Sequence, residues 1–292
     1  MVDMPRNLLS AIDNISECRN FHLGETKGVV SNMVSSQGKR LEDFVKASFC
    51  GIPDTGMPTD RASAFGAEEN TSDDVFCYDG SQNNPPDAML RDGGDAIEVK
   101  KIQMAYTGIA LNSSLPKRTL SADDPRITND ARTCEPWRSR DMLYATGWVE
   151  RETVRSIFFV YGDCMFKANE YYENKFEEIK NSINYDGLAQ DGNEYGLLRN
   201  ADGLEIGFNM RLRPINHHDN PRKIFSSIIE LDNKAKFSLV AIMRSSKFKS
   251  FPDMTQHLLT DNPTIKRQTE QIRDPDNPEG EIGAEVFSFT LS

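Results

Sequence analysis

Apolar residues recur along the chain with two different periods, and together these predict an α/β fold. Between positions 38 and 49 they lie three and four residues apart, as on one face of a helix, with Ser35 and Ser36 as possible N-terminal caps. The charged segment 168–183 also has helical spacing. Strand-like apolar runs occupy 142–149, 156–161, 204–212, 237–243 and 286–291. We therefore expect one domain spanning 1–292, with a mixed β-sheet flanked by helices.

A β-hairpin is predicted around the Asp-Gly dipeptide at positions 92–93. Asp-Gly between two apolar runs is a strong short-range signal for a hairpin with a two-residue turn. Counting outward from that turn places Asp87 opposite Glu98, on one face of the hairpin. Lys100 follows Glu98 by two residues, so it extends from the same face. The sequence therefore predicts that two carboxylates and one ammonium group lie together.

This prediction depends on the length of the turn. A three-residue turn (92–94) would place Asp87 opposite Val99, on the face away from Glu98. A four-residue turn (92–95) would pair Asp87 with Lys100 and restore the cluster. Two of the three plausible turns therefore build the site.

Two opposed carboxylates repel each other, and a hard divalent cation such as Mg²⁺ is the usual remedy. Neither half of the pattern is specific alone, because acid-x-Lys and Pro-Asp both recur elsewhere in the chain. Only Asp87 with Glu98-x-Lys100 combines them across a predicted turn. The competing interpretation is a Glu-Lys surface pair on a solvent-facing hairpin.

Composition narrows the class of protein only slightly. The net charge of −11 argues mildly against nucleic-acid binding, but basic residues gather at 100–101, 117–118, 211–222 and 244–249. The five cysteines include no CxxC pair, which favours reduced thiols in a cytoplasmic protein. No apolar run reaches the length of a membrane span, and the N-terminus lacks the apolar core of a signal peptide.

Metal-bound carboxylates beside a lysine suit phosphodiester hydrolysis, and the motif resembles that of a known nuclease superfamily. Pro86-Asp87 followed by Glu98, Val99 and Lys100 matches the PD-(D/E)xK nucleases in order. The runs 84–102 and 111–117 more closely resemble the NgoPII group of type II restriction endonucleases.

The resemblance implies a restriction-endonuclease-like core and Mg²⁺-dependent cleavage of double-stranded DNA. Asp87 and Glu98 would hold the metal, and Lys100 would act on the attacking water. It further implies a homodimer cutting a palindrome, with GGCC as the site and 5′-phosphate ends, and a cognate DNA methyltransferase. Related folds often add a helix glutamate, here Glu42. The competing interpretation of Glu42 is an acid on the solvent face of an amphipathic helix.

Candidate DNA contacts come from polar and basic segments. Base readout in the major groove relies on Arg, Asn and similar side chains, which are densest between 211 and 222. The candidates there are Arg211 and Arg213, alternating on a predicted strand, then Asn216, His217, His218 and Asn220 in a predicted polar loop at its end, and Arg222. Phosphate or sugar contacts are predicted for Asn112, Ser113, Ser114, Lys117 and Lys247. The competing interpretation of 211–222 is a solvated basic loop.

Two other classes of function remain open at this point. One is a structure-selective repair nuclease or junction resolvase with the same metal site. The other is a protein without catalysis, either a DNA-binding protein with a vestigial site or an interaction protein with a charged hairpin.

Overall fold

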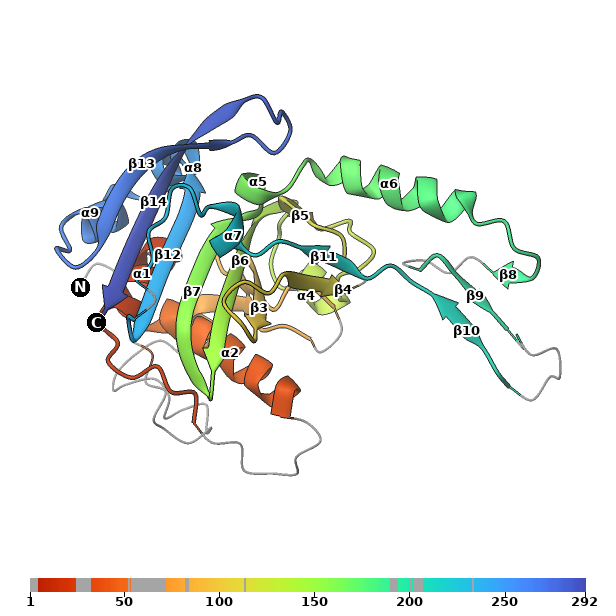
Figure 1. The fold of residues 1–292 in the computed structure, drawn as a ribbon, viewed down its shortest axis with the longest axis horizontal. Helices are drawn as coiled ribbons and strands as arrows, with labels where there is room; N and C mark the ends of the chain where they lie inside the picture. The colour runs from red at the N-terminus through yellow and green to blue at the C-terminus, as the bar shows by residue number, and fades with distance from the viewer. Residues whose placement is uncertain are drawn as a thin grey trace.

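A computed structural model describes residues 5–24, 33–51, 53, 72–81, 84–112, 114–189, 194–199, 201, 207–232 and 234–292. Its centre is a mixed sheet, shown in Figure 1. The strand order is β1 (Phe76–Tyr78), β2 (Ala88–Leu90), β3 (Ala96–Ile102), β6 (Ser139–Glu150), β7 (Thr153–Tyr161), β12 (Phe237–Arg244), β14 (Glu281–Leu291) and β13 (Lys266–Arg273). Strand β5 (Thr119–Ser121) also pairs with β6. The β3–β6 and β7–β12 pairs are parallel and the others antiparallel, so the predicted mixed sheet is confirmed.

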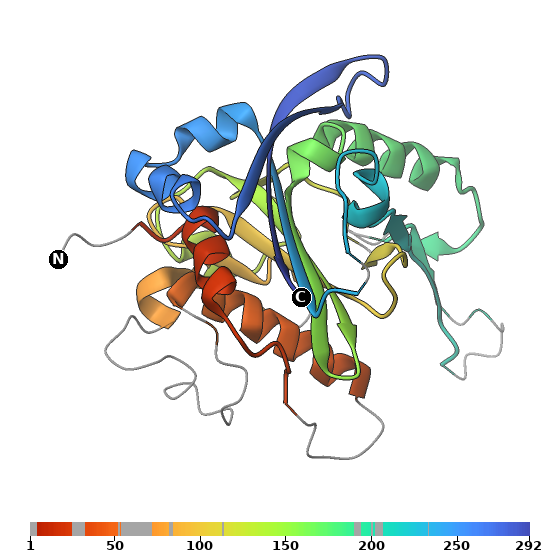
Figure 2. The same cartoon turned by 60° about the vertical axis from the view of Figure 1, so that its left-hand side comes forward.

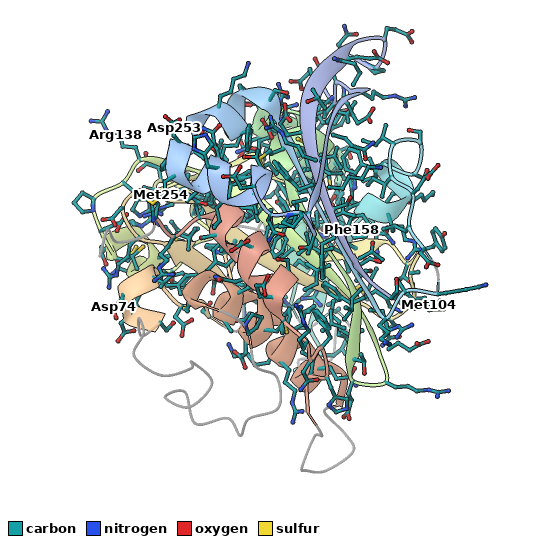
Figure 3. The ribbon with its side chains drawn as sticks, turned by 90° about the vertical axis from the view of Figure 1, so that its left-hand side faces the viewer. Asp74, Met104, Arg138, Phe158, Asp253 and Met254 are labelled. Atoms are coloured by element: carbon teal, nitrogen blue, oxygen red, sulfur yellow. The ribbon has the colours of Figure 1, made fainter. Side chains whose placement is uncertain are left out.

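The middle strands have nearly continuous apolar sequences because both of their faces are covered. In β12, all residues from Phe237 to Met243 are buried. Phe158 of β7 also lies inside the molecule, whereas Arg138 extends outward, as Figure 3 shows. The core therefore follows the centre of the sheet.

Helices α1 (Leu8–Glu17), α2 (Met33–Cys50) and α9 (Asp253–Thr260) lie on one side of the sheet (Figure 2). Helix α1 begins after Asn7, whose side chain accepts hydrogen bonds from two backbone N–H groups of the first turn. Helix α2 packs closely on β6 because Gly147 has no side chain. A Cβ there would lie 2.6 Å from Leu41.

The opposite side of the sheet carries a two-stranded ribbon and a short helix (Figure 1). The ribbon pairs β4 (Ile109–Asn112) with β11 (Asn216–His218), and α7 (Pro221–Ile224) follows it. An arm extends away from the body, formed by α6 (Asn169–Ser182) and a small sheet of β8 (Leu188–Ala189), β9 (Gly196–Leu198) and β10 (Met210–Leu212). Short helices complete the described elements: α3 (Ser72–Val75), α4 (Asn129–Thr133), α5 (Gly162–Met165) and α8 (Ser245–Ser250).

Most of the elements predicted from periodicity are confirmed, with three corrections. Helix α2 begins at Met33, so Ser35 and Ser36 lie inside its first turn and do not precede it. The strand expected at 204–212 is present only as β10 at 210–212, since 207–209 are not strand and 204–206 fall outside the described residues. The predicted polar loop around Asn216 is strand β11, because it pairs with distant β4. No helix in the described parts has the length and apolar character to cross a membrane.

Candidate active site

The hairpin between β2 and β3 has the two-residue turn predicted from Asp-Gly. Gly94 N–H donates to Arg91 O (3.0 Å), and both intervening residues have positive φ, 58° for Asp92 and 72° for Gly93. This is the turn type that matches the twist of paired strands. The strands pair Ala88 with Ile97, which is the register predicted for a two-residue turn.

This register brings Asp87, Glu98 and Lys100 together. Val99 N–H donates to Asp87 Oδ2 (2.6 Å), so the Asp87 carboxylate is held across the start of the hairpin. Lys100 Nζ donates to Glu98 Oε1 (2.5 Å). The three side chains also interact electrostatically, since Glu98 and Lys100 both act on Asp87.

The site has more negative charge than its own lysine neutralises. Burial raises the pKa of Asp87 to about 7, and the Glu98 carboxylate adds to that rise, while Lys100 and the Val99 N–H act against it. Burial opposes the charge of Lys100, but the Glu98 and Asp87 carboxylates outweigh it and raise the pKa of that lysine. Lys100 therefore stays cationic, and the Asp87 carboxyl keeps its proton to a higher pH than an ordinary aspartate does.

Glu98 has an oxygen that the described part of the protein leaves unsatisfied. The residue is 6% exposed, and Oε2 is buried without a hydrogen-bond partner there. It borders a cavity of about 10 Å³, room for about one water, lined also by Pro85, Leu111, Ser114, Lys117, Met142 and Tyr144. An unpaired buried carboxylate oxygen is costly, so this atom calls for a partner beyond the described residues, either a water or a bound cation.

The donor set fits Mg²⁺, although it is small. No three His, Cys, Asp or Glu side chains gather as a metal cluster in the described residues. Mg²⁺ is typically bound by one or two carboxylates, with water and substrate phosphate oxygens completing its shell. The carboxylates of Asp87 and Glu98, which interact electrostatically, would supply two hard oxygen donors of this kind.

Strand β6 adds side chains beside this cluster that sequence reasoning missed. In the parallel register Tyr144 lies beside Glu98, and Thr146 beside Lys100. Thr146 is 1% exposed, and its hydroxyl is another buried group without a partner in the described residues. The Tyr144 hydroxyl bonds to the backbone of Lys117, 3.1 Å from its N and 3.2 Å from its O. No single-sequence signal links β3 to β6, because their pairing is long-range.

Glu42 lies within electrostatic reach of the cluster but has partners on its own helix. Its carboxylate raises the pKa values of Asp87 and Lys100. Glu42 Oε1 lies 2.7 Å from Lys39 Nζ and 2.6 Å from Lys46 Nζ. Glu42 is therefore close enough to act on the site electrostatically, as the first interpretation requires. It also belongs to an ion-pair network on its own helix, which is closer to the second.

The predicted DNA contacts do not form one surface. Arg211 is largely exposed but holds Glu194 through two bonds, of 2.9 and 2.7 Å. Arg213 is exposed and lies just beyond the end of β10, so the two arginines do not share that strand. His217 is exposed on β11, on the body of the protein.

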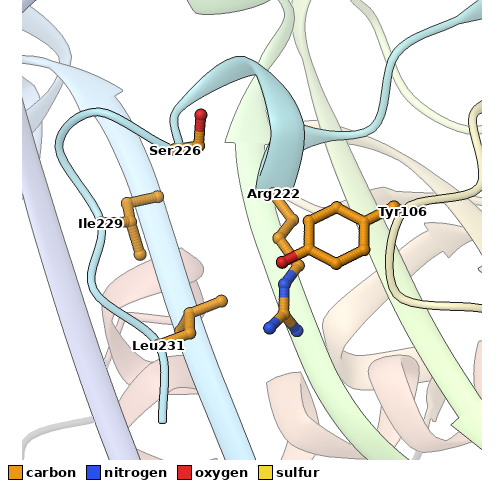
Figure 4. A pocket seen from close by; sticks show the side chains of 5 residues that line it. All are labelled: Tyr106, Arg222, Ser226, Ile229 and Leu231. Atoms are coloured by element: carbon orange, nitrogen blue, oxygen red, sulfur yellow. The ribbon is translucent and has the colours of Figure 1, made fainter. Parts of the chain in front are cut away.

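Other members of segment 211–222 hold the protein's own structure. Asn220 is 1% exposed, caps α7 and donates to Ala105 O (3.0 Å) and Thr107 O (2.7 Å). Arg222 stacks on the Tyr106 ring at 5.0 Å beside a pocket of about 180 Å³, shown in Figure 4. Asn216 Nδ2 donates to Ser114 O (3.0 Å) in the adjoining β4 segment. The His218 ring meets Phe166 edge-on at 4.7 Å.

The predicted phosphate contacts are mostly engaged as well. Lys117 is buried with its ammonium 2.5 Å from Asp124, and Lys247 lies between Asp95 (2.8 Å) and Asp141 (2.6 Å). Ser114 is half-buried. Ser113 lies outside the described residues, as does the side chain of Asn112.

Comparison with known proteins decides the family. A model of the NgoPII restriction endonuclease family matches residues 6–273. The chain belongs to that family. It is 31% identical over 289 residues, 98% of this chain and 100% of the relative, to the Type II restriction enzyme NgoPII of Neisseria gonorrhoeae. No solved structure matches the chain.

Family membership confirms the resemblance inferred from 84–102 and 111–117. The chain is a type II restriction endonuclease, a site-specific nuclease that acts on double-stranded DNA. The repair-nuclease and non-catalytic alternatives are set aside by this membership. The roles of individual residues rest on the geometry alone.

Proposed function

We propose that the chain cleaves DNA with Mg²⁺ held by Asp87 and Glu98, in a site of the PD-(D/E)xK type completed by Lys100. The observation that carries this proposal is the buried Glu98 Oε2, which has no hydrogen-bond partner among the described residues, in a residue that interacts electrostatically with Asp87 and helps to raise its pKa to about 7. In a hairpin that served only stability, we would expect the Glu98 and Asp87 carboxylates to be compensated by nearby cations or hydrogen-bond donors.

Each residue has a distinct task in this proposal. When bound, Mg²⁺ acidifies the attacking water and offsets charge developing on the phosphate. Asp87 is held ready by the Val99 N–H, which leaves its other oxygen to face the ion. Lys100, kept cationic by its two carboxylate neighbours, orients the water and stabilises negative charge on the phosphoryl oxygens in the transition state.

The target proposed is the palindrome GGCC, cut to give 5′-phosphate ends. It rests on family resemblance, as do a homodimer with one site per strand and a cognate methyltransferase. We also infer that 1–292 act as one domain, because the central sheet takes strands from both the hairpin region and the C-terminal region. Glu42 is proposed to act only at a distance, through the charge it adds to the site.

Among the DNA-contact candidates, Arg211, Arg213 and His217 are the best placed, since all three are exposed. Asn216, His218, Asn220, Arg222, Lys117 and Lys247 remain predictions, and their observed partners favour structural roles. Asn112, Ser113 and Ser114 also remain predictions.

The test is digestion of a fully sequenced phage DNA with Mg²⁺, by the wild type and by Asp87→Ala, with EDTA as a further arm. Asp43→Ala is the matched control, since Asp43 is an exposed acid on α2 next to Glu42. We expect discrete fragments from the wild type and Asp43→Ala, and none from Asp87→Ala or with EDTA. Sequencing the fragment ends decides GGCC separately. Cleavage by Asp87→Ala at the wild-type rate would refute the metal site.

A further inference from the structure

The turn of the β2–β3 hairpin is hydrogen-bonded by one carboxylate from another segment of the chain. Glu135, in the segment after α4, accepts hydrogen bonds from two successive backbone N–H groups of the turn. Its Oε2 lies 3.2 Å from Asp92 N, and its Oε1 lies 2.8 Å from Gly93 N. Turn N–H groups at a hairpin tip usually face water, so a charged acceptor on both is an added constraint.

Arg140, at the start of β6, completes these contacts from the other side. Its side chain is fully buried, and Nη1 donates at 2.5 Å to both Leu90 O and Gly94 O, the carbonyls on either side of the turn. Its Nη2 forms an ion pair with Glu135. The two side chains and the turn therefore form a closed hydrogen-bonded ring in which carbonyls and N–H groups are both held.

This set of hydrogen bonds is compatible with only one length of turn. It needs N–H groups at 92 and 93 directed to one side and carbonyls at 90 and 94 directed to Arg140, as in the two-residue turn. A three-residue turn rearranges these groups and moves Asp87 to the face away from Glu98, because side chains alternate along a strand. Asp92 also has a positive φ of 58°, which is an uncommon backbone conformation for a residue other than glycine.

We propose that Glu135 and Arg140 are positioning residues that lock the register of the hairpin and so hold Asp87 beside Glu98. They touch the turn at 90–94, and their known contacts do not include Asp87, Glu98 or Lys100. The inference rests on the proposed function of those three residues, and it extends the active site to a pair outside the hairpin.

The opposite edge of the sheet offers a matched control. Glu285 of β14 is 4% exposed and pairs with Arg267 of β13 at 2.9 Å, so it is a second carboxylate bonded to an arginine, more deeply buried than Glu135. The variants are Glu135→Ala, the milder Glu135→Gln and, as control, Glu285→Gln. The readouts are kcat, KM and the Mg²⁺ concentration for half-maximal rate on a short duplex, the metal-free affinity for that duplex, and the melting temperature.

For Glu135→Ala we expect kcat to fall by about 10- to 100-fold, since a displacement of about 1 Å at a reacting group costs about that much. The Mg²⁺ midpoint should rise, while KM and metal-free DNA affinity stay near wild type. Glu135→Gln, which keeps one acceptor oxygen, should lie between. Glu285→Gln should lower the melting temperature without changing kcat or the Mg²⁺ midpoint at temperatures below unfolding.

Hydrogen exchange of the metal-free protein tests the register lock without any activity. Val99 N–H should exchange faster in Glu135→Ala and Glu135→Gln than in Glu285→Gln, because Asp87 Oδ2 no longer holds it. Unchanged Val99 exchange in both Glu135 variants would overturn the inference. So would equal losses of kcat in the Glu135 and Glu285 variants. Failure of the proposed function shows separately, as cleavage by Asp87→Ala.

Discussion

The two ends of the central sheet both contain an antiparallel strand pair with a buried glutamate, yet they treat that glutamate differently. At the β13–β14 end, the Glu285 carboxylate accepts from Ser245 Oγ (3.0 Å), Arg267 Nε (2.9 Å) and Thr269 Oγ1 (3.1 Å). At the β2–β3 end, Glu98 has one lysine on Oε1 and no partner within the described residues on Oε2.

The difference separates a carboxylate that the fold satisfies from one with an oxygen left unpaired among the described residues, as expected of the proposed metal ligand. Burying a charged group without full compensation is unfavourable, and the protein avoids it at Glu285. At the hairpin, two carboxylates are buried without full compensation. One is Glu98, and the other is Asp87, whose pKa is raised to about 7 by burial and by the Glu98 charge. Such local deficits are typical of functional sites.

Exchanging each glutamate for its amide breaks the comparison most sharply. Glu98→Gln should reduce cleavage by about 10²- to 10³-fold or more, because one anionic oxygen donor is lost from the proposed metal site. Glu285→Gln should leave cleavage intact and lower stability by about 1.5–3 kcal/mol, from hydrogen bonds to a charged group. Cleavage rates and denaturant unfolding of both variants check this. Equal losses of rate would mean that the two glutamates do the same work.

Glu42 should give a smaller effect, because Lys39 and Lys46 already engage it. We expect Glu42→Gln to lower kcat less than about tenfold, since the substitution removes one distant charge from the site and otherwise affects the ion pairs of Glu42 with Lys39 and Lys46. The measurement is single-turnover cleavage at saturating Mg²⁺. A loss of a hundredfold would instead place Glu42 in direct contact with the metal or its water.

The smallest expected effect concerns stability without metal. The Asp87 carboxyl has its pKa raised from 3.8 to about 7 by burial and Glu98, with Glu42 adding to the rise and Lys100 and the Val99 N–H opposing it. Between these two pH values the unfolded chain releases a proton that the folded chain keeps, so rising pH weakens folding and the effect levels off above 7. Asp87→Asn removes this term and keeps an acceptor for Val99.

In EDTA, Asp87→Asn should therefore melt higher than the wild type at pH 8, and the difference should shrink towards pH 4. Thermal unfolding across that range measures it. A difference in melting temperature that is constant with pH would mean that the pKa of Asp87 is not raised in the metal-free protein.

The hairpin could be predicted from the sequence because its information is local. Asp92-Gly93 specifies the turn, and the alternation of apolar residues carries the register as far as Asp87 and Glu98. Helix α2 and the central strands followed from periodicity for the same reason. Residues 216–218 are a strand only because distant β4 pairs with them, which no local pattern reveals.

The surroundings of the site were not predictable in this way. Glu135 and Arg140 meet the hairpin through contacts 42 to 50 residues apart in sequence. Thr146 lies beside Lys100 in a parallel strand pair, whose register follows from the fold and not from either strand. Asn220 and Arg222 are of residue types that often contact DNA bases, but here Asn220 caps helix α7 and Arg222 stacks on the Tyr106 ring. Residue type alone did not distinguish these uses.

The hairpin also has an evolutionary consequence. All three proposed catalytic side chains come from one contiguous stretch, 87–100, whereas the exposed candidates for reading DNA lie more than a hundred residues later, on the β10 segment and β11. On the proposed assignment, cutting and recognition are encoded in separate parts of the gene. Substitutions in the later segment would then change which sequence is recognised and leave the proposed cutting element unchanged.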